Sequence, residues 1–268
     1  MFHVVNFRGL LIVALTLFLA LGLGACTTKK KEYKERPVET LYNDAMDSLL
    51  AKDYGKAVES FDEVERQHPY SQWATKAQLM SAYAYYLKNA YDDAIVALDR
   101  FIQLHPTNKD VAYAYYLKGL SYYEQISDVA RDQQMTKLAL STLDELMKRF
   151  PNSKYARDAR LKIDLTNDHL AGKEMEIGRY YQTKGHFLAA INRFKVVVDD
   201  YQTTTHVPEA LHRLTEAYLS LGVAEEARKT AAVLGHNFPG SEWYLDSYGI
   251  VENKDMRPKK DKPWYKPW

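Results

Sequence analysis

Residues 82–106 read AYAYYLKNAYDDAIVALDRFIQLHP, and this stretch decides the fold. Its informative positions combine small residues, large apolar residues and a closing proline: Ala82, Tyr85, Ala94, Leu98, Phe101 and Pro106. Small residues let two helices approach closely, and the large residues fill the space between them. Proline ends a helix because it lacks the backbone N–H. The stretch therefore predicts two packed helices, the second of which ends before Pro106.

The same pattern recurs along the chain, which predicts a repeat architecture. In the second helix of each copy, the small, large, large and proline positions are Ala57, Phe61, Val64 and Pro69; Ala139, Leu143, Leu146 and Pro151; and Ala227, Ala231, Leu234 and Pro239. A further copy has Ala190, Phe194 and Val197, with Gln202 in the place of the proline. The small residues of the first helices, several of them 37 residues apart, are Ala45, Ala82, Gly119, Gly178 and Thr215.

This pattern resembles the tetratricopeptide repeat, a pair of antiparallel helices of about 34 residues. The resemblance implies an all-α solenoid of five helix pairs, and an irregular helical bundle is the alternative. Two departures from the period matter. Eight extra residues fall around 127–135, between the helices of repeat three, and fourteen more precede Ala190. Fourteen residues are close to four helical turns, which predicts one long first helix in repeat four, over 155–183. Repeats one to three then occupy 39–153, and repeats four and five occupy 154–240.

The N-terminus has the plan of a secretory signal. Arg8 precedes an apolar stretch from Leu10 to Leu21, and Leu23-Gly24-Ala25-Cys26 follows. The apolar stretch is shorter than the roughly 20 residues that span a bilayer, so we interpret residues 1–25 as a signal peptide. A small pair before a cysteine resembles the lipobox of bacterial lipoproteins, which implies that Cys26 is acylated and that 26–38 form a lipidated linker. An ordinary signal peptide with a chance cysteine is the alternative.

Composition excludes several classes of function. Removing residues 1–25 deletes one arginine and no acid, so the formal charge of +1 falls to zero, and a neutral chain is not typical of a nucleic-acid binder. The sequence contains no paired-ligand spacing for a metal, no phosphate-binding glycine loop and no nucleophile elbow. We therefore expect no enzyme activity, no cofactor and no metal. An enzyme of cell-wall metabolism is the rival from another class, and it lacks a catalytic constellation.

The first helices of the repeats suggest a binding surface. Residues at i, i+4 and i+7 share one helix face, and in the first three repeats these positions are all apolar or aromatic: Tyr42, Met46 and Leu49; Leu79, Tyr83 and Tyr86; Tyr116, Leu120 and Tyr123. We call these nine residues the front strip. The equivalent positions in the last two repeats are more polar: Met175, Arg179 and Gln182; His212, Glu216 and Leu219. The front strip predicts a groove for a peptide with aromatic anchors, or else it packs helix against helix.

The end of the chain, 241–268, differs in composition. After Asn253 it is basic and ends with Trp264, Tyr265 and Trp268 between prolines. Either it is a solvated end, or it touches an anionic membrane surface or a partner.

A lipobox followed by five such repeats resembles the BamD (ComL) family, lipoproteins of the outer-membrane β-barrel assembly machine. Three segments carry the resemblance: 82–86 (AYAYY), 99–107 (DRFIQLHPT) and 150–155 (FPNSKY). It implies a non-enzymatic scaffold anchored through Cys26 to the periplasmic face of the outer membrane, and Thr27 after the cysteine resembles an outer-membrane sorting signal. Another periplasmic repeat lipoprotein, such as a secretin pilot or a protease adaptor, is the alternative.

The resemblance also implies partners. In that family the C-terminal repeats hold the periplasmic domains of the barrel-forming subunit, and Arg193 matches an arginine near that interface. The N-terminal repeats receive the C-terminal, aromatic-ending signal of unfolded outer-membrane proteins. Other lipoproteins of the complex and the membrane itself, through the acyl chains, complete the expected partners, and no nucleic acid is among them.

Overall fold

The computed structural model describes residues 35–253, and all eleven regular elements in this range are helices. The predicted lipidation site at Cys26 and nearly all of the basic tail lie outside the described residues. Helices α2 to α7 are Val38–Leu50, Tyr54–Gln67, Gln72–Leu87, Tyr91–Leu104, Val111–Tyr123 and Gln134–Arg149. Helices α8 to α12 are Ala156–Thr183, Phe187–Asp200, Val207–Ser220, Ala224–Asn237 and Glu242–Glu252. No helix among the described residues is both long enough and apolar enough to cross a membrane.

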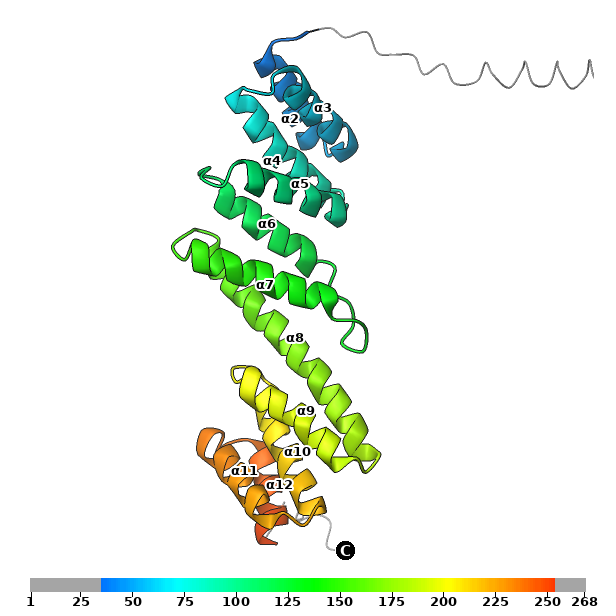
Figure 1. Ribbon diagram of the computed structural model, residues 1–268, viewed down its shortest axis with the longest axis vertical. Coiled ribbons are helices and arrows are strands. Elements are labelled where there is room, and N and C mark those ends of the chain that lie inside the picture. Colours follow the sequence, from blue (N-terminus) through cyan, green and yellow to red (C-terminus); the bar gives the residue numbers. More distant parts are fainter. Residues whose placement is uncertain (1–34, 254–268) are drawn as a thin grey trace, which may run out of the picture. The chain divides into compact units, whose positions relative to one another are not determined.

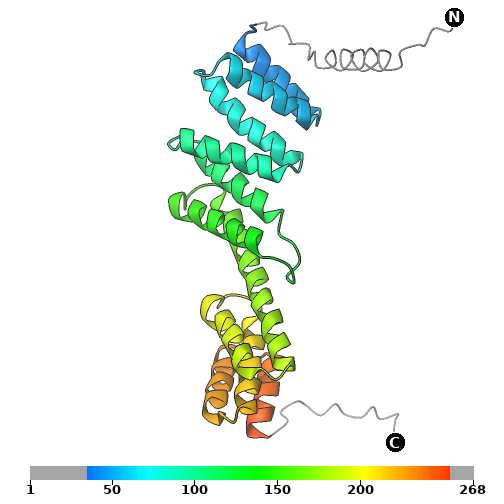
Figure 2. The same cartoon turned by 45° about the vertical axis from the view of Figure 1, so that its right-hand side comes forward.

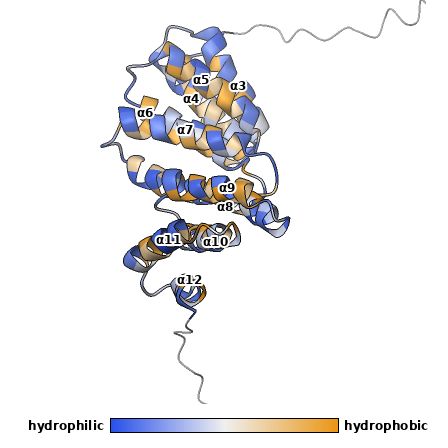
Figure 3. Cartoon of the chain, turned by 60° about the horizontal axis from the view of Figure 1, so that its bottom comes forward, coloured by the Kyte–Doolittle hydropathy of each residue, from blue (hydrophilic) through white to orange (hydrophobic). Residues whose placement is uncertain are grey.

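The helices pack in chain order, each against its neighbours in sequence (Figures 1 and 2). First helices of adjacent pairs also touch, α2 with α4 and α4 with α6. Apolar and polar residues alternate along the helices (Figure 3), as expected where each helix buries one face. This arrangement confirms the all-α, tetratricopeptide-like fold.

The small positions of the repeat do what the spacing predicts. Ala45, Ala82 and Thr215 are fully buried. A Cβ added at Gly119 would lie 2.5 Å from Leu143 Cδ2, and one at Gly178 would lie 2.4 Å from Phe194 Cε1. The two helices of these pairs therefore approach so closely that an added Cβ would require the facing side chain to move.

Four of the turns within the pairs share one backbone device. Lys52, Asn89, Gly185 and Gly222 all have positive φ, from 61° to 77°. In each turn the next N–H donates to a carbonyl inside the preceding helix, as in Ala90 N to Tyr85 O at 3.0 Å. This is the left-handed residue that commonly ends a helix. In the third pair, a longer loop between α6 and α7 replaces the turn, where the eight extra residues were expected.

Helix α8 is the long helix that the fourteen extra residues predict, and the prediction is confirmed. It has 28 residues and begins at Ala156, within one residue of the expected start. It packs on α7 through its first turns and on α9. Helix α12 follows the last pair and packs against α10 and α11.

Candidate functional site

The front strip lies on α2, α4 and α6, and its nine residues are not equally accessible. Leu49 and Leu79 are only 7% exposed and belong to the core. The other seven are partly exposed: Tyr42, Met46, Tyr83, Tyr86, Tyr116, Leu120 and Tyr123. One part of the strip therefore packs helix against helix, and the larger part leaves apolar and phenolic surface in contact with solvent.

Aromatic contacts connect the strip from one helix to the next. The ring centroids of Tyr42 and Trp73 lie 4.8 Å apart, and those of Tyr83 and Tyr113 lie 6.4 Å apart. The rings of Tyr116 and Tyr155 stack, with centroids 5.1 Å apart and planes inclined by 20°. Such aromatic pairs stabilise by about 0.5–1.5 kcal/mol beyond the area that they bury. The ring contacts thus form two groups, one around Tyr42 and Trp73 and one that joins Tyr83, Tyr113, Tyr155 and Tyr116.

Polar groups fix the hydroxyl ends of this surface. Tyr116 donates to Asp158 Oδ2 at 2.5 Å, and Tyr86 donates to Glu124 Oε1 at 3.3 Å. The Lys162 ammonium lies 4.6 Å from the centroid of the Tyr123 ring. Burial, together with the Glu124 carboxylate, raises the pKa of Tyr86 to about 12, so its hydroxyl remains a neutral donor near neutral pH.

A cavity of about 390 Å³ opens beside the strip, between α2, α4 and the start of α6. Tyr42 and Leu79 from the strip line it, together with Lys76, Met80 and Tyr113. Burial, with nearby tyrosines, raises the pKa of Tyr113. The cavity joins an apolar floor to one ammonium group and to the carboxylate of Asp110, a combination suited to an aromatic side chain with polar neighbours.

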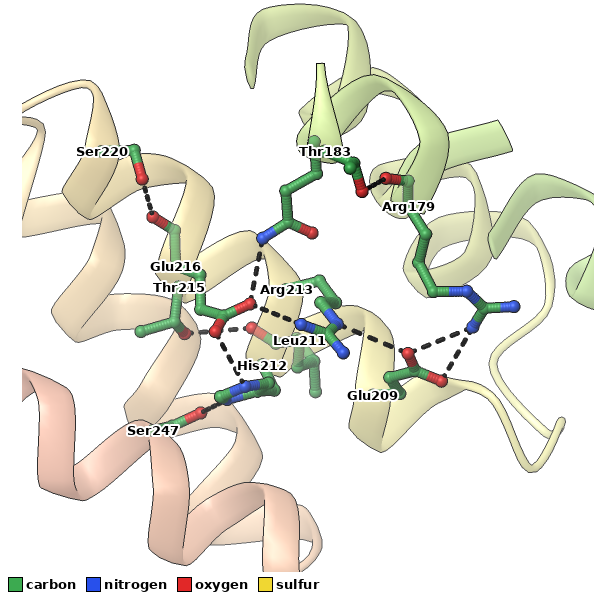
Figure 4. A network of polar contacts seen from close by, with 11 residues as sticks. Arg179, Thr183, Glu209, Leu211, His212, Arg213, Thr215, Glu216, Ser220 and Ser247 are labelled. Carbon is green, nitrogen blue, oxygen red and sulfur yellow. Dashed lines mark hydrogen bonds and ion pairs between the residues drawn. The ribbon is translucent and has the colours of Figure 1, made fainter. Parts of the chain in front are cut away.

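The equivalent positions on α8 and α10 are occupied by a polar network (Figure 4). Arg179 Nη1 donates to both oxygens of Glu209, at 3.1 and 3.0 Å. Gln182 Nε2 donates to Glu216 Oε2 at 2.9 Å, and Arg213 Nη1 donates to the same oxygen at 2.9 Å. We call these five residues, with His212, the rear network. Met175, predicted in the same stripe, is fully buried in the core.

His212 and Glu216 form the buried end of this network. His212 is 4% exposed, its Nδ1 lies 2.9 Å from Ser247 Oγ and its Nε2 lies 3.4 Å from Glu216 Oε1. The contact with His212, opposed by burial and supported by Gln182 and Arg213, lowers the pKa of Glu216 to about 2. The carboxylate is therefore ionised at every physiological pH.

Arg193 lies on α9, outside the rear network. Its Nη1 donates to Glu174 Oε2 of α8 at 3.0 Å, and about two fifths of its side chain is exposed. The guanidinium therefore has one internal partner and retains donors that face solvent.

Sequence reasoning missed three residues at the front strip: Trp73, Tyr113 and Tyr155. Tyr113 lies one turn before Tyr116 on α6, which was a usable signal. The residue 37 positions earlier is Lys76, so the apolar recurrence stopped short of Tyr113. Trp73 and Tyr155 lie near the starts of α4 and α8, outside the period of the strip.

Residues 35–253 contain no cluster of three or more histidine, cysteine, aspartate or glutamate side chains placed to hold a metal ion. In these residues the stripe is aromatic on α2, α4 and α6 and charge-paired on α8 and α10.

Known proteins with a similar sequence extend this picture. A family model described as "Outer membrane lipoprotein" (YfiO) matches residues 34–234. Outer membrane protein assembly factor BamD of Caulobacter vibrioides is 52% identical over 244 residues, which cover 90% of this chain and 80% of that protein. The protein of the same description from Rickettsia prowazekii is 49% identical over 243 residues, covering 90% and 97%. Among solved structures, the tetratricopeptide-repeat domain of P58(IPK) aligns with a TM-score of 0.42 at 16% identity, over 80% of this chain and 56% of that one.

Proposed function

The chain belongs to the BamD family of outer membrane protein assembly factors, and from this premise we propose that its front strip receives the C-terminal signal of unfolded outer-membrane barrel proteins. Membership makes it a non-enzymatic component of the outer-membrane assembly machinery of Gram-negative bacteria. The substrate, the partner contacts and the anchor are the parts that we propose.

The observation that supports the proposal is the chain of partly exposed tyrosines across α2, α4 and α6. A barrel protein ends in a strand whose alternate side chains are apolar or aromatic, and alternate side chains of a strand point to the same face. Those side chains can lie on the strip, while the tyrosine hydroxyls offer hydrogen bonds to the peptide backbone. The Lys76 ammonium, 4.7 Å from the centroid of the Trp73 ring, can receive a terminal carboxylate at the cavity, which Asp110 also lines.

The test measures binding of a barrel C-terminal peptide to Tyr83→Ala/Tyr123→Ala. Aromatic contacts contribute on the order of 1–3 kcal/mol each, so we expect a loss of at least about tenfold. Because Tyr83 also packs on the core, Tyr83→Phe/Tyr123→Phe serves as a second variant that keeps the packing, and we expect it to retain most of the binding. Tyr180→Ala, at a 60% exposed tyrosine outside the strip, is the matched control. Full binding by the folded double alanine variant would contradict the proposal.

We further propose that Arg193 contributes to holding the periplasmic domains of the barrel-forming subunit. Its exposed donors and its pairing with a single carboxylate, Glu174, support this role. Arginine is common among the few residues that dominate an interface. Arg193→Ala and Arg193→Glu should weaken pull-down of those domains. Glu174→Gln, which removes the internal partner and keeps the guanidinium, should not. If both Arg193 variants bound those domains as strongly as the wild type does, this role would be excluded.

The anchor is the third part of the proposal. Acylation at Cys26 would hold the protein on the periplasmic face of the outer membrane, beside the other lipoproteins of the complex, because several acyl chains give stable binding. Cys26→Ser should be released from envelopes by a salt wash, whereas the wild type should require detergent. A Cys26→Ser protein of mature size that still requires detergent would overturn this part.

A further inference from the structure

Helix α12 stands at the end of the repeat array and buries less of its surface than the first helices before it (Figure 1). Of its eleven residues only Ser247 is buried, whereas α10 buries seven of fourteen. Its substantial contacts are with α10 and α11, and no second helix follows it within residues 35–253. The end of a repeat array usually has a polar outer face, but six residues of α12 are apolar or aromatic. One side of α12 therefore lacks the cover that each earlier first helix has.

The inner side of α12 is fixed to the last helix pair. Ser247 Oγ lies 2.9 Å from His212 Nδ1, and the ring centroids of Trp243 and His212 lie 5.2 Å apart. A Cβ added at Gly235 would lie 2.4 Å from Tyr244 Cε2, so the Tyr244 ring occupies the space beside that glycine. Helix α12 is thus docked on α10 and α11 as a first helix would be.

The uncovered side of α12 faces the place where a second helix would pack. In α8 and α10 a tyrosine, Tyr181 or Tyr218, follows the buried small residue by three positions and packs against the rear core. In α12 the buried small residue is Ser247, and Ile250 follows it by three positions. Ile250 is 45% exposed. The position that packs within the earlier pairs therefore remains open in α12.

The backbone turns at the end of α12 as it does inside the earlier pairs. Asn253 has φ 53° and ψ 39°, the left-handed conformation that commonly ends a helix. Asn89, Gly185 and Gly222 have the same conformation, and at each of them the chain turns from a first helix toward the second helix that covers it. The residues after Asn253 therefore start where a covering segment starts.

The segment that follows is the basic tail, residues 254–268. Its prolines, Pro258, Pro263 and Pro267, are incompatible with a second helix of the usual length, because proline interrupts a helix. Fifteen extended residues reach up to about 50 Å, and the eleven residues of α12 span only about 16 Å. The tail is therefore long enough to pass back along the whole uncovered side.

Charge complementarity favours the tail over a membrane as the segment that covers α12. Helix α12 has three acids and no lysine or arginine, whereas the tail has six lysine and arginine residues and two acids. Glu242 and Glu252 form no ion pair or side-chain hydrogen bond with another described residue. These acids repel an anionic lipid surface and attract a cationic segment.

We propose that the basic tail folds back on its own α12 and covers it in the place of the second helix of a sixth pair. The three aromatic residues of the tail pack on the apolar side around Ile250, and its lysines lie beside Glu242 and Glu252. The tail is then an internal cap of the repeat array. It uses neither the front strip nor Arg193, so the cap and the proposed function can fail independently.

The first experiment measures hydrogen exchange of the α12 amides in the full chain and in a chain that ends at Asn253. Without the tail we expect α12 to exchange at least about tenfold faster, with α2 to α7 unchanged, because an uncovered helix opens more often. Trp264→Ser/Trp268→Ser should exchange as the shortened chain does. Tyr70→Ser, at a fully exposed aromatic residue elsewhere, should exchange as the wild type does.

Two outcomes of this experiment would overturn the proposal. One is unchanged exchange of α12 in the shortened chain, which would show that the tail does not cover it. The other is protection of α12 that rises with protein concentration, which would assign the covering tail to a second copy of the chain.

The second experiment tests the contact in cells, where membrane and partners compete. A photo-crosslinking residue replaces Trp264, and the linked peptides are identified by mass spectrometry. We expect crosslinks to α12 within one chain, with a severalfold lower yield when Ile250→Lys is added. Val96→Lys, at a 70% exposed site on α5, should leave the yield unchanged. Crosslinks only to lipid, to another protein or to a second copy would overturn the proposal.

A charge exchange separates contact from damage to α12. Glu242→Lys/Glu252→Lys should lower the yield of the same crosslink severalfold, because it places cations beside the cations of the tail. Adding Lys259→Glu/Lys260→Glu should restore most of the yield. A change in the tail cannot repair a damaged helix, so failure to recover would contradict the proposed pairing.

Discussion

The contact between α4 and α6 and the contact between α8 and α10 occupy equivalent places in the repeat but use opposite chemistry. In front, Tyr83 faces Tyr113 and Tyr86 donates to Glu124. Behind, the equivalent positions are Arg179, paired with Glu209, and Gln182, bonded to Glu216. The same arrangement of neighbouring first helices therefore accommodates either aromatic or charged side chains between them.

The two surfaces differ in how many of their side chains a ligand could contact without first breaking existing hydrogen bonds. The charges of the rear network already have partners, so a ligand that used them would first have to break hydrogen bonds worth about 1.5–3 kcal/mol each when one group is charged. The front strip has apolar surface that a ligand can cover without such a loss. The same repeat scaffold therefore presents partly exposed apolar and phenolic groups in front and charged groups that are already paired behind.

The largest expected effect tests whether the two regions share the same core. Phe61 and Phe194 hold equivalent positions and are both fully buried. Each Phe→Ala change should lower the free energy of unfolding by about 3–5 kcal/mol. Urea titration followed by helical circular dichroism measures this, with Val96→Ala, at a 70% exposed site, as the near-neutral control. A loss in one region alone would mean that the cores differ as well as the surfaces.

The second prediction uses pH to separate the regions. The folded pKa of Glu216, about 2, is below its ordinary 4.5, so its stabilisation is present above pH 4.5 and is lost as pH falls toward 2. After allowance for partial exposure, we expect Glu216→Gln to cost about 2 kcal/mol at pH 7 and less at pH 3. Urea unfolding at both pH values measures it. A cost that does not shrink at pH 3 would contradict the assignment.

The front strip should respond at the opposite end of the pH range. The folded pKa of Tyr86 is raised from 10 to about 12, so its contribution is complete below pH 10 and is lost as pH rises through 12. Tyr86→Phe should remove that alkaline loss and leave the acid response unchanged.

The third prediction compares the two glycines that let the helix pairs approach. A Cβ at Gly178 meets the rigid ring of Phe194, whereas one at Gly119 meets the flexible end of Leu143. Overpacking costs about 1–3 kcal/mol, offset by about 1 kcal/mol of helix propensity gained from Gly→Ala. Gly178→Ala should therefore be destabilised by about 1–2 kcal/mol, and Gly119→Ala should be near neutral. Thermal unfolding of both variants measures the difference, and the reverse order would contradict the packing argument.

The smallest expected effect concerns a cation beside an aromatic ring. Lys162 lies 4.6 Å from the Tyr123 ring in front, and Lys184 lies 5.8 Å from the Tyr180 ring behind. A double-mutant cycle of Lys162→Met with Tyr123→Leu should give about 0.5 kcal/mol of coupling. The corresponding cycle at Lys184 and Tyr180 should give less. Stronger coupling behind than in front would reverse this part of the comparison.

The fold was predictable because the same small and large residues are buried at the same positions in each helix pair. The spacing of Ala82 and Phe101 predicted that both are buried. The fourteen extra residues before Ala190 are close to four helical turns, which favoured a longer helix over a loop. Gly185, Gly222 and Asn89 are residue types that commonly take the left-handed conformation at the end of a helix, so the sequence carried a usable signal for these turns. Lys52 has the same period without such a residue type, so its conformation could not be assigned from the sequence.

The site was less predictable because its contacts cross from one repeat to another. A face defined by i, i+4 and i+7 is wide enough to include both core and surface, which is why Leu79 is buried while Tyr83 remains partly exposed. The partners Tyr155 and Glu209 belong to other helices, and no period within a repeat names them.

The neighbour-to-neighbour packing of the helices also has a consequence for how quickly the chain can fold. In residues 38–252, helices in substantial contact are adjacent in sequence or separated by one other helix. Contacts between nearby segments close short loops, and chains rich in such contacts fold in microseconds to milliseconds. The whole sequence has one cysteine, so no internal disulfide has to form or rearrange. A helix pair can therefore become structured as soon as it is free to do so, and each formed pair offers the next a surface on which to grow.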